Sequence, residues 1–140
     1  GMRRGEIAQI HARDLTRDLT GWSITVHGKG QRERTSPLPD DLAIDLRQAC
    51  KTGGGWAFPG RIGGHLSARR VGELATDVLP GIWTLHTLRH AYATRLHDAT
   101  HDLIAVQQLL GHASVATTQR YVATDRDRLR RAITAGARAA

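Results

Sequence analysis

The sequence predicts an α+β domain that is mainly helical, with a small antiparallel sheet of two or three strands packed on a helical bundle. Residues 22–26 alternate apolar with smaller or polar side chains, which is the period of a strand. Residues 84–99 carry apolar residues at spacings of three and four, which is the period of a helix. A length of 140 residues matches one ordinary domain, so we expect residues 1–140 to share a single core.

The composition is that of a globular protein with a basic surface. Hydrophobic residues make up 40% of the chain, and 20 Lys and Arg against 13 Asp and Glu give a net charge of +7. This excess of positive charge predicts a polyanionic partner. The alternative explanation is a GC-rich genome whose proteins are rich in arginine. No apolar run reaches the roughly 18 residues of a membrane-spanning helix, so we expect a nucleic acid as partner and no membrane.

The cysteine content points to a reducing compartment. Cys50 is the one cysteine of the chain. A single thiol forms no intramolecular disulfide and no cysteine-based zinc site. We therefore expect a cytoplasmic protein without a signal peptide.

The first half of the chain is expected to hold the sheet. Residues 2–10 predict a short helix. Residues 22–26 and 32–38 predict a β-hairpin, because the glycine-flanked turn HGKGQ lies between them and places Lys29 near its tip. The glycine-rich connector that comes later in this half is expected to hold a short third strand at Trp56–Phe58.

Two helices are expected on either side of that connector. Residues 40–50 predict the first, which begins at a pair of aspartates. Residues 66–79 predict the second, with Ser67 as its N-cap. In the first helix, the apolar residues Leu42, Ile44 and Leu46 follow this start.

The last third of the chain is expected to be helical throughout. Residues 84–99 predict a long helix, and residues 102–110 predict a second one that Gly111 ends. Further helices are expected at 114–122 and 125–140. The apolar stripe of the long helix, which would make Tyr92 a core residue, is predicted to be Leu85, Leu88, Tyr92 and Leu96.

Six polar side chains stand out because a packed fold has no need of them at their positions: Arg3, Lys29, His86, Arg89, His112 and Tyr121. A phosphodiester is a substrate that suits this set, because an arginine fork binds two phosphate oxygens and histidine moves a proton near neutral pH. Tyrosine, with a reference pKa of about 10, becomes a usable nucleophile where cations stabilise its anion. Such a site needs no metal or other cofactor when enough arginine is present.

Two histidine pairs raise zinc as an alternative. His86 with His90, and His97 with His101, have the i, i+4 spacing of zinc ligands on a helix. No HExxH motif accompanies them and the nearby aspartates complete no clear ligand set, so we expect no metal. His97 and His101 are interpreted as a solvated helix end, and His90 as a buried or supporting neighbour of the site.

The motifs that carry these residues resemble, in order and spacing, those of the catalytic domain of tyrosine recombinases, the phage integrase family. GMRRGEI resembles the first-arginine box and VHGKGQRERTSPLP resembles the hairpin with the catalytic lysine. HTLRH is similar to the His-x-x-Arg box, and LLGHASVATTQRYV resembles the terminal box with the second histidine and the tyrosine. The resemblance covers nearly the whole chain and implies the fold of that catalytic domain.

The resemblance implies cleavage and rejoining of DNA strands. Tyr121 would attack the scissile phosphate, forming a 3′-phosphotyrosyl link and releasing a 5′-oxygen that Lys29 protonates. Arg3 and Arg89 would hold the non-bridging oxygens, and His86 would act as a general acid or base.

Other residues would support this reaction. His112 would hydrogen-bond the phosphate in the transition state. Arg32, Arg34 and Arg120 are the further expected DNA contacts, and structural roles are an open alternative for the first two.

The resemblance also implies a larger assembly. Family members carry an upstream DNA-clamping domain and earlier helices of the catalytic domain, so we expect residues 1–140 to be part of a longer architecture. Double-stranded DNA would be the partner, and a homotetramer on DNA the full-length assembly. The alternative is an integrase remnant that binds DNA or regulates without performing chemistry.

Overall fold

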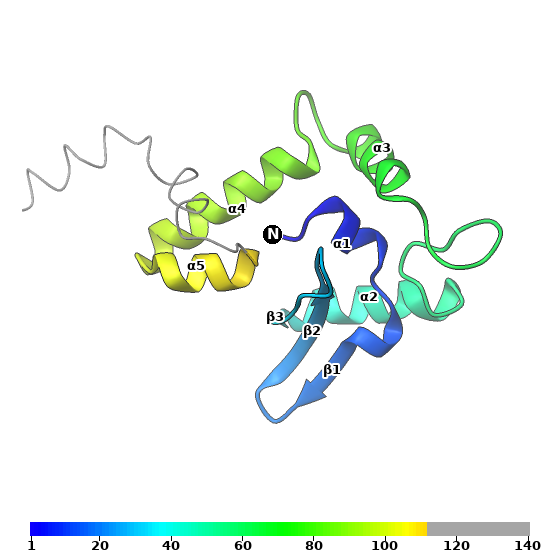
Figure 1. The fold of residues 1–140 in the computed structure, drawn as a ribbon, viewed down its shortest axis with the longest axis horizontal. Helices are drawn as coiled ribbons and strands as arrows, with labels where there is room; N and C mark the ends of the chain where they lie inside the picture. The colour runs from blue at the N-terminus through cyan, green and yellow to red at the C-terminus, as the bar shows by residue number, and fades with distance from the viewer. Residues whose placement is uncertain (112–140) are drawn as a thin grey trace, which may run out of the picture.

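The computed structural model describes residues 1–111, which form a mainly helical α+β fold with a three-stranded antiparallel sheet, as the sequence predicts. Figure 1 shows the first helix at the centre of the molecule, with the other helices and the sheet arranged around it. None of the helices in this part of the chain is long and apolar enough to cross a membrane. The elements in chain order are α1 (Arg4–Ala8), a 3-10 turn (Ala12–Asp14), β1 (Leu15–Asp18), β2 (Gly21–His27), β3 (Glu33–Leu38), α2 (Asp40–Thr52), α3 (Ala68–Val78), α4 (Leu85–Thr100) and α5 (Leu103–Leu110).

The sheet has the strand order β1-β2-β3, and both neighbouring pairs are antiparallel. β2 and β3 form the predicted hairpin, in which His27 pairs with Glu33 beside the turn. Ile24 and Val26 are each 1% exposed, because alternate residues of β2 face the core.

The third strand is β1, so the prediction of a strand at Trp56–Phe58 is wrong. Trp56 makes only an isolated bridge with His11. β1 has a single apolar residue, Leu15, and its other three residues are exposed. Such an edge strand lacks the alternation that marks a half-buried strand, so the sequence carries no periodic signal for it.

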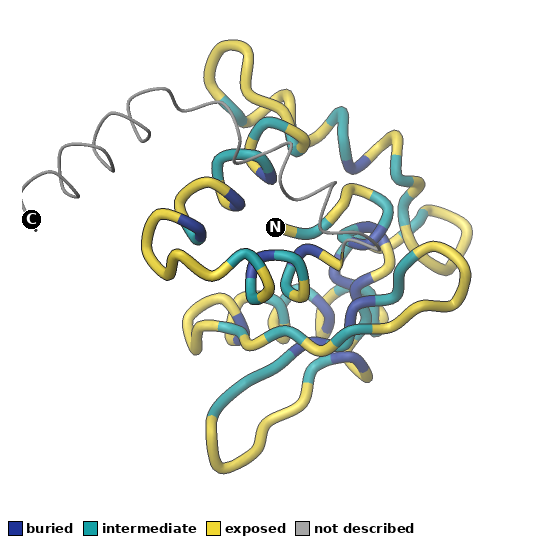
Figure 2. Tube along the Cα trace, turned by 60° about the vertical axis from the view of Figure 1, so that its left-hand side comes forward, coloured by how far each residue is buried: buried dark blue, intermediate teal, exposed yellow. Residues whose placement is uncertain are grey.

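The main core lies between the sheet and α2, and Figure 2 shows the buried positions in the interior with exposed loops around them. On α2, Ala43 is fully buried, whereas Leu42 and Ile44 are 45% and 62% exposed. Leu46 packs against the core. The buried members of this core are Ile10, Ile24, Val26, Cys50 and Ala57.

A second cluster joins α4 to α5 through Ala93, Val106 and Leu110, with Leu96 packed against it. The predicted stripe of α4 is wrong at Leu88 and Tyr92, which are 39% and 37% exposed. The face that α4 buries carries Arg89, Ala93 and His97, at spacings of four. His97 is 2% exposed and so does not lie at a solvated helix end.

Local capping signals set the ends of the helices. Ser67 caps α3 as predicted, accepting a hydrogen bond from the backbone N–H of Arg70 at 3.2 Å. Thr84 caps α4, and Asp102 begins α5 by accepting from two backbone N–H groups of its first turn. Gly111 ends α5 with a φ of 63°, in the left-handed region that favours glycine.

One titratable side chain ties the hairpin to the 3-10 turn. His27 Nε2 lies 2.9 Å from Asp14 Oδ1, and its Nδ1 lies 2.8 Å from Glu33 Oε1. The hydrogen bond to Asp14 is the main cause that raises the pKa of His27 above its usual value; burial opposes this shift and Glu33 adds to it.

We expect this contact to stabilise the fold most in weakly acidic solution. Because the pKa is raised in the folded state, the stabilisation is full below the unfolded pKa of about 6.5 and is lost as the pH rises through the folded-state pKa. Urea denaturation of the wild type and His27→Gln should show a larger difference in free energy of unfolding at about pH 6 than at about pH 9. A difference of equal size at both pH values would contradict this assignment.

Candidate phosphate-binding site

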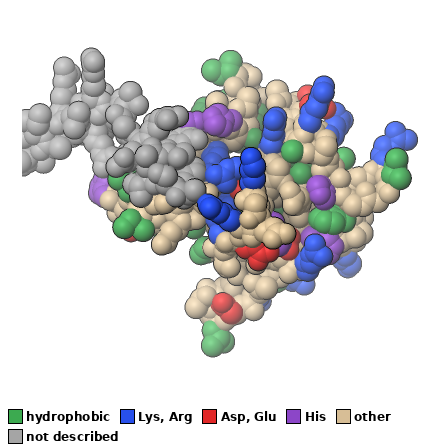
Figure 3. Space-filling view, viewed as in Figure 1, with side chains coloured by type: hydrophobic (Ala, Val, Ile, Leu, Met, Phe, Trp, Pro, Cys, Tyr) green, Lys and Arg blue, Asp and Glu red, His purple; other side chains and the backbone are tan. Residues whose placement is uncertain are grey.

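A pocket of about 890 Å³ opens between α1, α3 and α4, and it gathers Arg3, His86 and Arg89. Arg3 directly precedes α1, while His86 and Arg89 lie within one turn of each other on α4. Figure 3 shows Lys and Arg side chains gathered near the middle of one face of the molecule. Two guanidinium groups and an imidazole on one pocket suit the oxygens of a phosphate. The other charged residues of the lining are Arg4, Arg69, Glu73 and Asp77.

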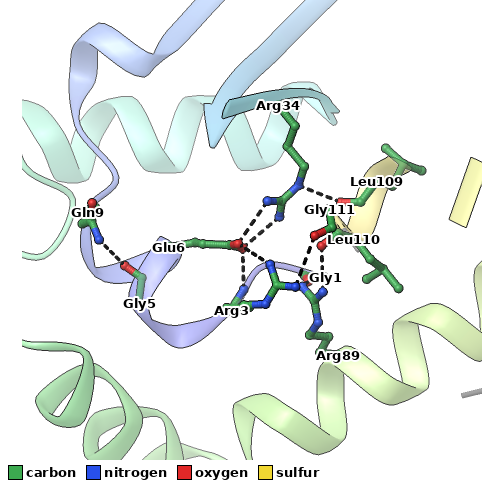
Figure 4. Close-up of polar contacts among 10 residues, drawn as sticks. All are labelled: Gly1, Arg3, Gly5, Glu6, Gln9, Arg34, Arg89, Leu109, Leu110 and Gly111. Carbon is green, nitrogen blue, oxygen red and sulfur yellow. Dashed lines mark hydrogen bonds and ion pairs between the residues drawn. The ribbon is translucent and has the colours of Figure 1, made fainter. Parts of the chain in front are cut away.

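Arg3 is held by a buried carboxylate one helical turn along the chain (Figure 4). Glu6 Oε2 accepts a hydrogen bond from the Arg3 backbone N–H at 2.8 Å, and Glu6 Oε1 accepts from Arg3 Nη1 at 2.8 Å. The first contact is half of a capping box, in which the third residue of a helix closes back on the N-cap. The second contact fixes the side chain that the sequence predicts as catalytic.

Glu6 is a residue that the sequence interpretation missed. Its side chain is only 4% exposed, and Arg34 donates to both of its oxygens, at 3.0 Å and 2.8 Å. Burial works to raise the pKa of Glu6, but the hydrogen bonds from Arg34 and Arg3 lower it to about 2. The Arg-x-x-Glu spacing at the start of a helix is the signal that could have identified it.

Arg89 is 5% exposed, which an arginine tolerates only when its N–H groups find acceptors. Its Nη2 donates to the backbone oxygen of Leu110 at 2.7 Å, and its Nη1 donates to the backbone oxygen of Gly1. Because α5 ends at Leu110, Arg89 also lies at the negative end of that helix dipole. Although Arg89 is charged, the structure buries it on one face of α4 together with Ala93 and His97.

His86 and His90 form a hydrogen-bonded pair at the side of the pocket. Their Nε2 atoms are 2.8 Å apart and their rings meet edge to face at 4.4 Å between centroids. One nitrogen donates and the other accepts, so the two Nε2 atoms share one proton. Burial lowers the pKa of His90, and His86 and Arg89 lower it further. His90 is thus hydrogen-bonded to His86, and its supporting role in the site stays a prediction.

Lys29 lies where the sequence predicts it, in the exposed turn between β2 and β3. It does not line the pocket of Arg3, so the structure does not bring it together with the two arginines. Arg32 lines another pocket, of about 640 Å³, beside His27 and Glu33 on the hairpin. The roles of Lys29 and Arg32 stay predictions.

Arg34 points inward, unlike its neighbour Arg32. Its side chain is 14% exposed, and besides Glu6 its Nε donates to the backbone oxygen of Leu109 at 3.0 Å. Of the two roles considered for Arg34, these contacts favour the structural one over DNA binding.

Three predicted residues, His112, Arg120 and Tyr121, lie outside the described residues. Within residues 1–111, no three His, Cys, Asp or Glu side chains are grouped as a metal site. His86 and His90, one of the two pairs that raised zinc as an alternative, are hydrogen-bonded to each other.

Sequence comparison identifies the family. Residues 1–128 match the sequence model of the phage integrase family. Tyrosine recombinase XerC of Xylella fastidiosa strain M23 is 38% identical over 139 aligned positions, covering 89% of this chain and 45% of the relative. Tyrosine recombinase XerC of Syntrophus aciditrophicus strain SB is 35% identical, covering 92% of this chain and 47% of the relative. The chain thus spans about half the length of the curated relatives it matches.

Solved structures agree with this result. XerA recombinase superposes with a TM-score of 0.74 at 26% identity, covering 96% of this chain and 53% of that one. XerH bound to its difH substrate, in a pre-cleavage complex, superposes with a TM-score of 0.68 at 29% identity. The match covers 94% of this chain and 42% of the XerH chain. The integrase from mycobacterium phage Brujita superposes with a TM-score of 0.65 at 33% identity. The match covers 93% of this chain and 44% of the integrase chain. These matches confirm the tyrosine-recombinase catalytic-domain fold, and the match over residues 1–128 shows that the chain belongs to the phage integrase family.

Proposed function

We propose that this chain is the catalytic domain of a site-specific DNA recombinase, which cuts and rejoins strands through a 3′-phosphotyrosine intermediate. The observation that carries the proposal is the pocket shared by Arg3, His86 and Arg89, which come from opposite ends of the described chain. Its tyrosine recombinase relatives support the same assignment.

The arginines would act on the non-bridging oxygens of the scissile phosphate. Their guanidinium groups are already held in place by Glu6 and by the end of α5, so little reorganisation is needed when charge develops in the transition state. His86 shares a proton with His90 and can donate or accept one at the pocket.

Covalent chemistry would belong to Tyr121. Its hydroxyl gives its proton to His86 as general base while its oxygen forms a bond to phosphorus. The bond from phosphorus to the 5′-oxygen breaks, and Lys29 gives that oxygen a proton. His112 would hydrogen-bond the phosphate in this step. Attack by the 5′-hydroxyl of another strand then restores a phosphodiester and frees Tyr121, so the exchange consumes no external energy source.

The proposed partner is double-stranded DNA, in line with a net charge of +7 and with the XerH structure solved on its difH substrate. Arg32 and Arg120 are proposed DNA contacts. We further propose a cytoplasmic site of action, a phage or phage-derived origin, and a homotetramer on DNA for the full-length protein.

Covalent trapping on nicked duplexes tests the function. A library of duplexes with a nick a few bases from each candidate phosphate loses a short fragment after attack, so the protein stays attached. The chain should give a shifted band on a denaturing gel, alone or fused behind the upstream half of a XerC relative, and Tyr121→Phe should abolish it.

Tyr92→Phe is the matched control, because it removes the same hydroxyl from an exposed residue of α4. Its band should equal that of the wild type. DNA binding without any covalent band, in both the chain and the fusion, would favour the binding-only remnant.

A further inference from the structure

The end of α5 is held by three arginines, one on each of three consecutive backbone oxygens (Figure 4). Arg34 Nε donates to Leu109 at 3.0 Å, Arg89 Nη2 to Leu110 at 2.7 Å and Arg3 Nη2 to Gly111 at 3.2 Å. Arg3 and Arg89 belong to the proposed phosphate site. Arg34 is the member of this set that the proposed reaction does not use.

Arg34 joins three elements that are distant in the sequence. From β3 it reaches Glu6 on α1 through two hydrogen bonds and Leu109 on α5 through a third. It is also packed tightly there, because a Cβ added to Gly111 would lie 2.8 Å from Arg34 Nη1. A guanidinium with three engaged N–H groups and 14% exposure is poorly placed to bind DNA.

The sharing of Glu6 determines what Arg3 can do. Each oxygen of Glu6 accepts two hydrogen bonds, one from Arg34 and one from Arg3. Arg34 therefore occupies half of the acceptor capacity of the carboxylate. Arg3 is left with a single side-chain bond to Glu6, and its other terminal nitrogen extends to Gly111.

We propose that Arg34 is a positioning residue, which holds Glu6 against the end of α5 so that Arg3 presents its guanidinium to the phosphate. This inference rests on the proposed function. Without Arg34, the freed acceptor positions of Glu6 would draw Arg3 into a two-pronged pair and away from the pocket.

A substrate that does not need Arg3 tests this directly. A single methylphosphonate isomer at the scissile position carries a methyl group in place of one non-bridging oxygen, and the group is therefore uncharged. Charge stabilisation by an arginine is then no longer required at that oxygen. Arg34→Met should lower single-turnover cleavage of the normal phosphate by about 10- to 100-fold, the loss expected from a misplaced catalytic group. On the methylphosphonate the loss of rate for Arg34→Met should shrink to about 3-fold or less. Arg3→Ala should show the same small loss on this substrate.

Two variants with the same loss of charge serve as controls. Arg17→Met, on the exposed edge strand β1, should leave both rates unchanged. Arg32→Met should weaken DNA binding and its salt dependence, with equal effects on both substrates. Equal losses for Arg34→Met on both substrates, or a loss confined to DNA affinity, would overturn the positioning role.

A measurement without DNA separates this inference from the proposed function. Carboxyl NMR titration of the DNA-free chain should show that Arg34→Met raises the pKa of Glu6 well above about 2, with the fold intact by circular dichroism. An unchanged pKa of Glu6 would refute the role of Arg34. If the wild type forms no covalent adduct but this pKa rises, the proposed function fails and the contact of Arg34 with Glu6 stands.

Discussion

Replacing Glu6 by glutamine is expected to lower the free energy of unfolding by about 3 kcal/mol at neutral pH. The carboxylate is buried, and it accepts three hydrogen bonds from the guanidinium groups of Arg34 and Arg3 and a fourth from the Arg3 backbone N–H. Removing one partner of such a buried network leaves charge without compensation, which costs on the order of 3–5 kcal/mol. The lowered pKa of about 2 gives a similar size, at about 1.4 kcal/mol for each pH unit.

The pH dependence of this effect has a definite sign. The pKa of Glu6 is depressed by folding, so its stabilisation is fully present above the unfolded pKa of about 4.3 and is lost as the pH falls towards about 2. Denaturation curves at several pH values should therefore show the wild type and Glu6→Gln converging in acid.

Glu73→Gln is the matched control for this experiment. Glu73 pairs with Arg69 and Arg70 on the surface of α3, where solvent screens the interaction. Glu73→Gln should therefore leave the free energy of unfolding nearly unchanged. A cost below about 1 kcal/mol for Glu6→Gln would show that the arginines do not depend on this carboxylate.

Replacing Arg89 by lysine is expected to lower the single-turnover rate of strand cleavage by about 1000-fold, the scale seen when a transition-state donor is lost. Lysine keeps the charge but loses the planar fork. Arg89 needs that fork, because it donates to the backbone oxygens of Leu110 and Gly1 while also lining the pocket. Rapid-quench sampling of adduct on the nicked duplex gives the rate.

Arg95→Lys provides the comparison on the same helix, since Arg95 is exposed and does not line the pocket. Its rate should match the wild type. If Arg89→Lys retained more than about a tenth of the wild-type rate, Arg89 would act as a point charge and not as a fork.

Local patterns in the sequence sufficed for much of the fold and for part of the site. The turn HGKGQ identified the hairpin with Lys29, Ser67 identified the start of α3, and Gly111 identified the end of α5. The motifs named Arg3, His86 and Arg89, which line one pocket. These features depend on neighbouring residues, or on motifs whose spacing is itself in the sequence.

Features that depend on distant partners could not be predicted in this way. Arg89 and His97 are polar, so helical periodicity places them on the outer side of α4, yet the acceptors at the end of α5 allow Arg89 to be buried. In the sequence, Arg34 cannot be distinguished from its exposed neighbour Arg32. The difference lies in the contacts of Arg34 with Glu6 and Leu109, which come from distant parts of the chain. β1 is recognised only by its pairing with β2.

If Tyr121 attacks a DNA phosphate, the covalent adduct must lie on Tyr121, and locating that adduct tests the proposed function. Protein trapped on the nicked duplex is digested with nuclease and protease, and the peptide that carries the nucleotide is sequenced by tandem mass spectrometry. We expect a 3′-nucleotide on the peptide that contains Tyr121, with none on the peptide that contains Tyr92. A nucleotide on any other residue would contradict the assignment of Tyr121 as the nucleophile.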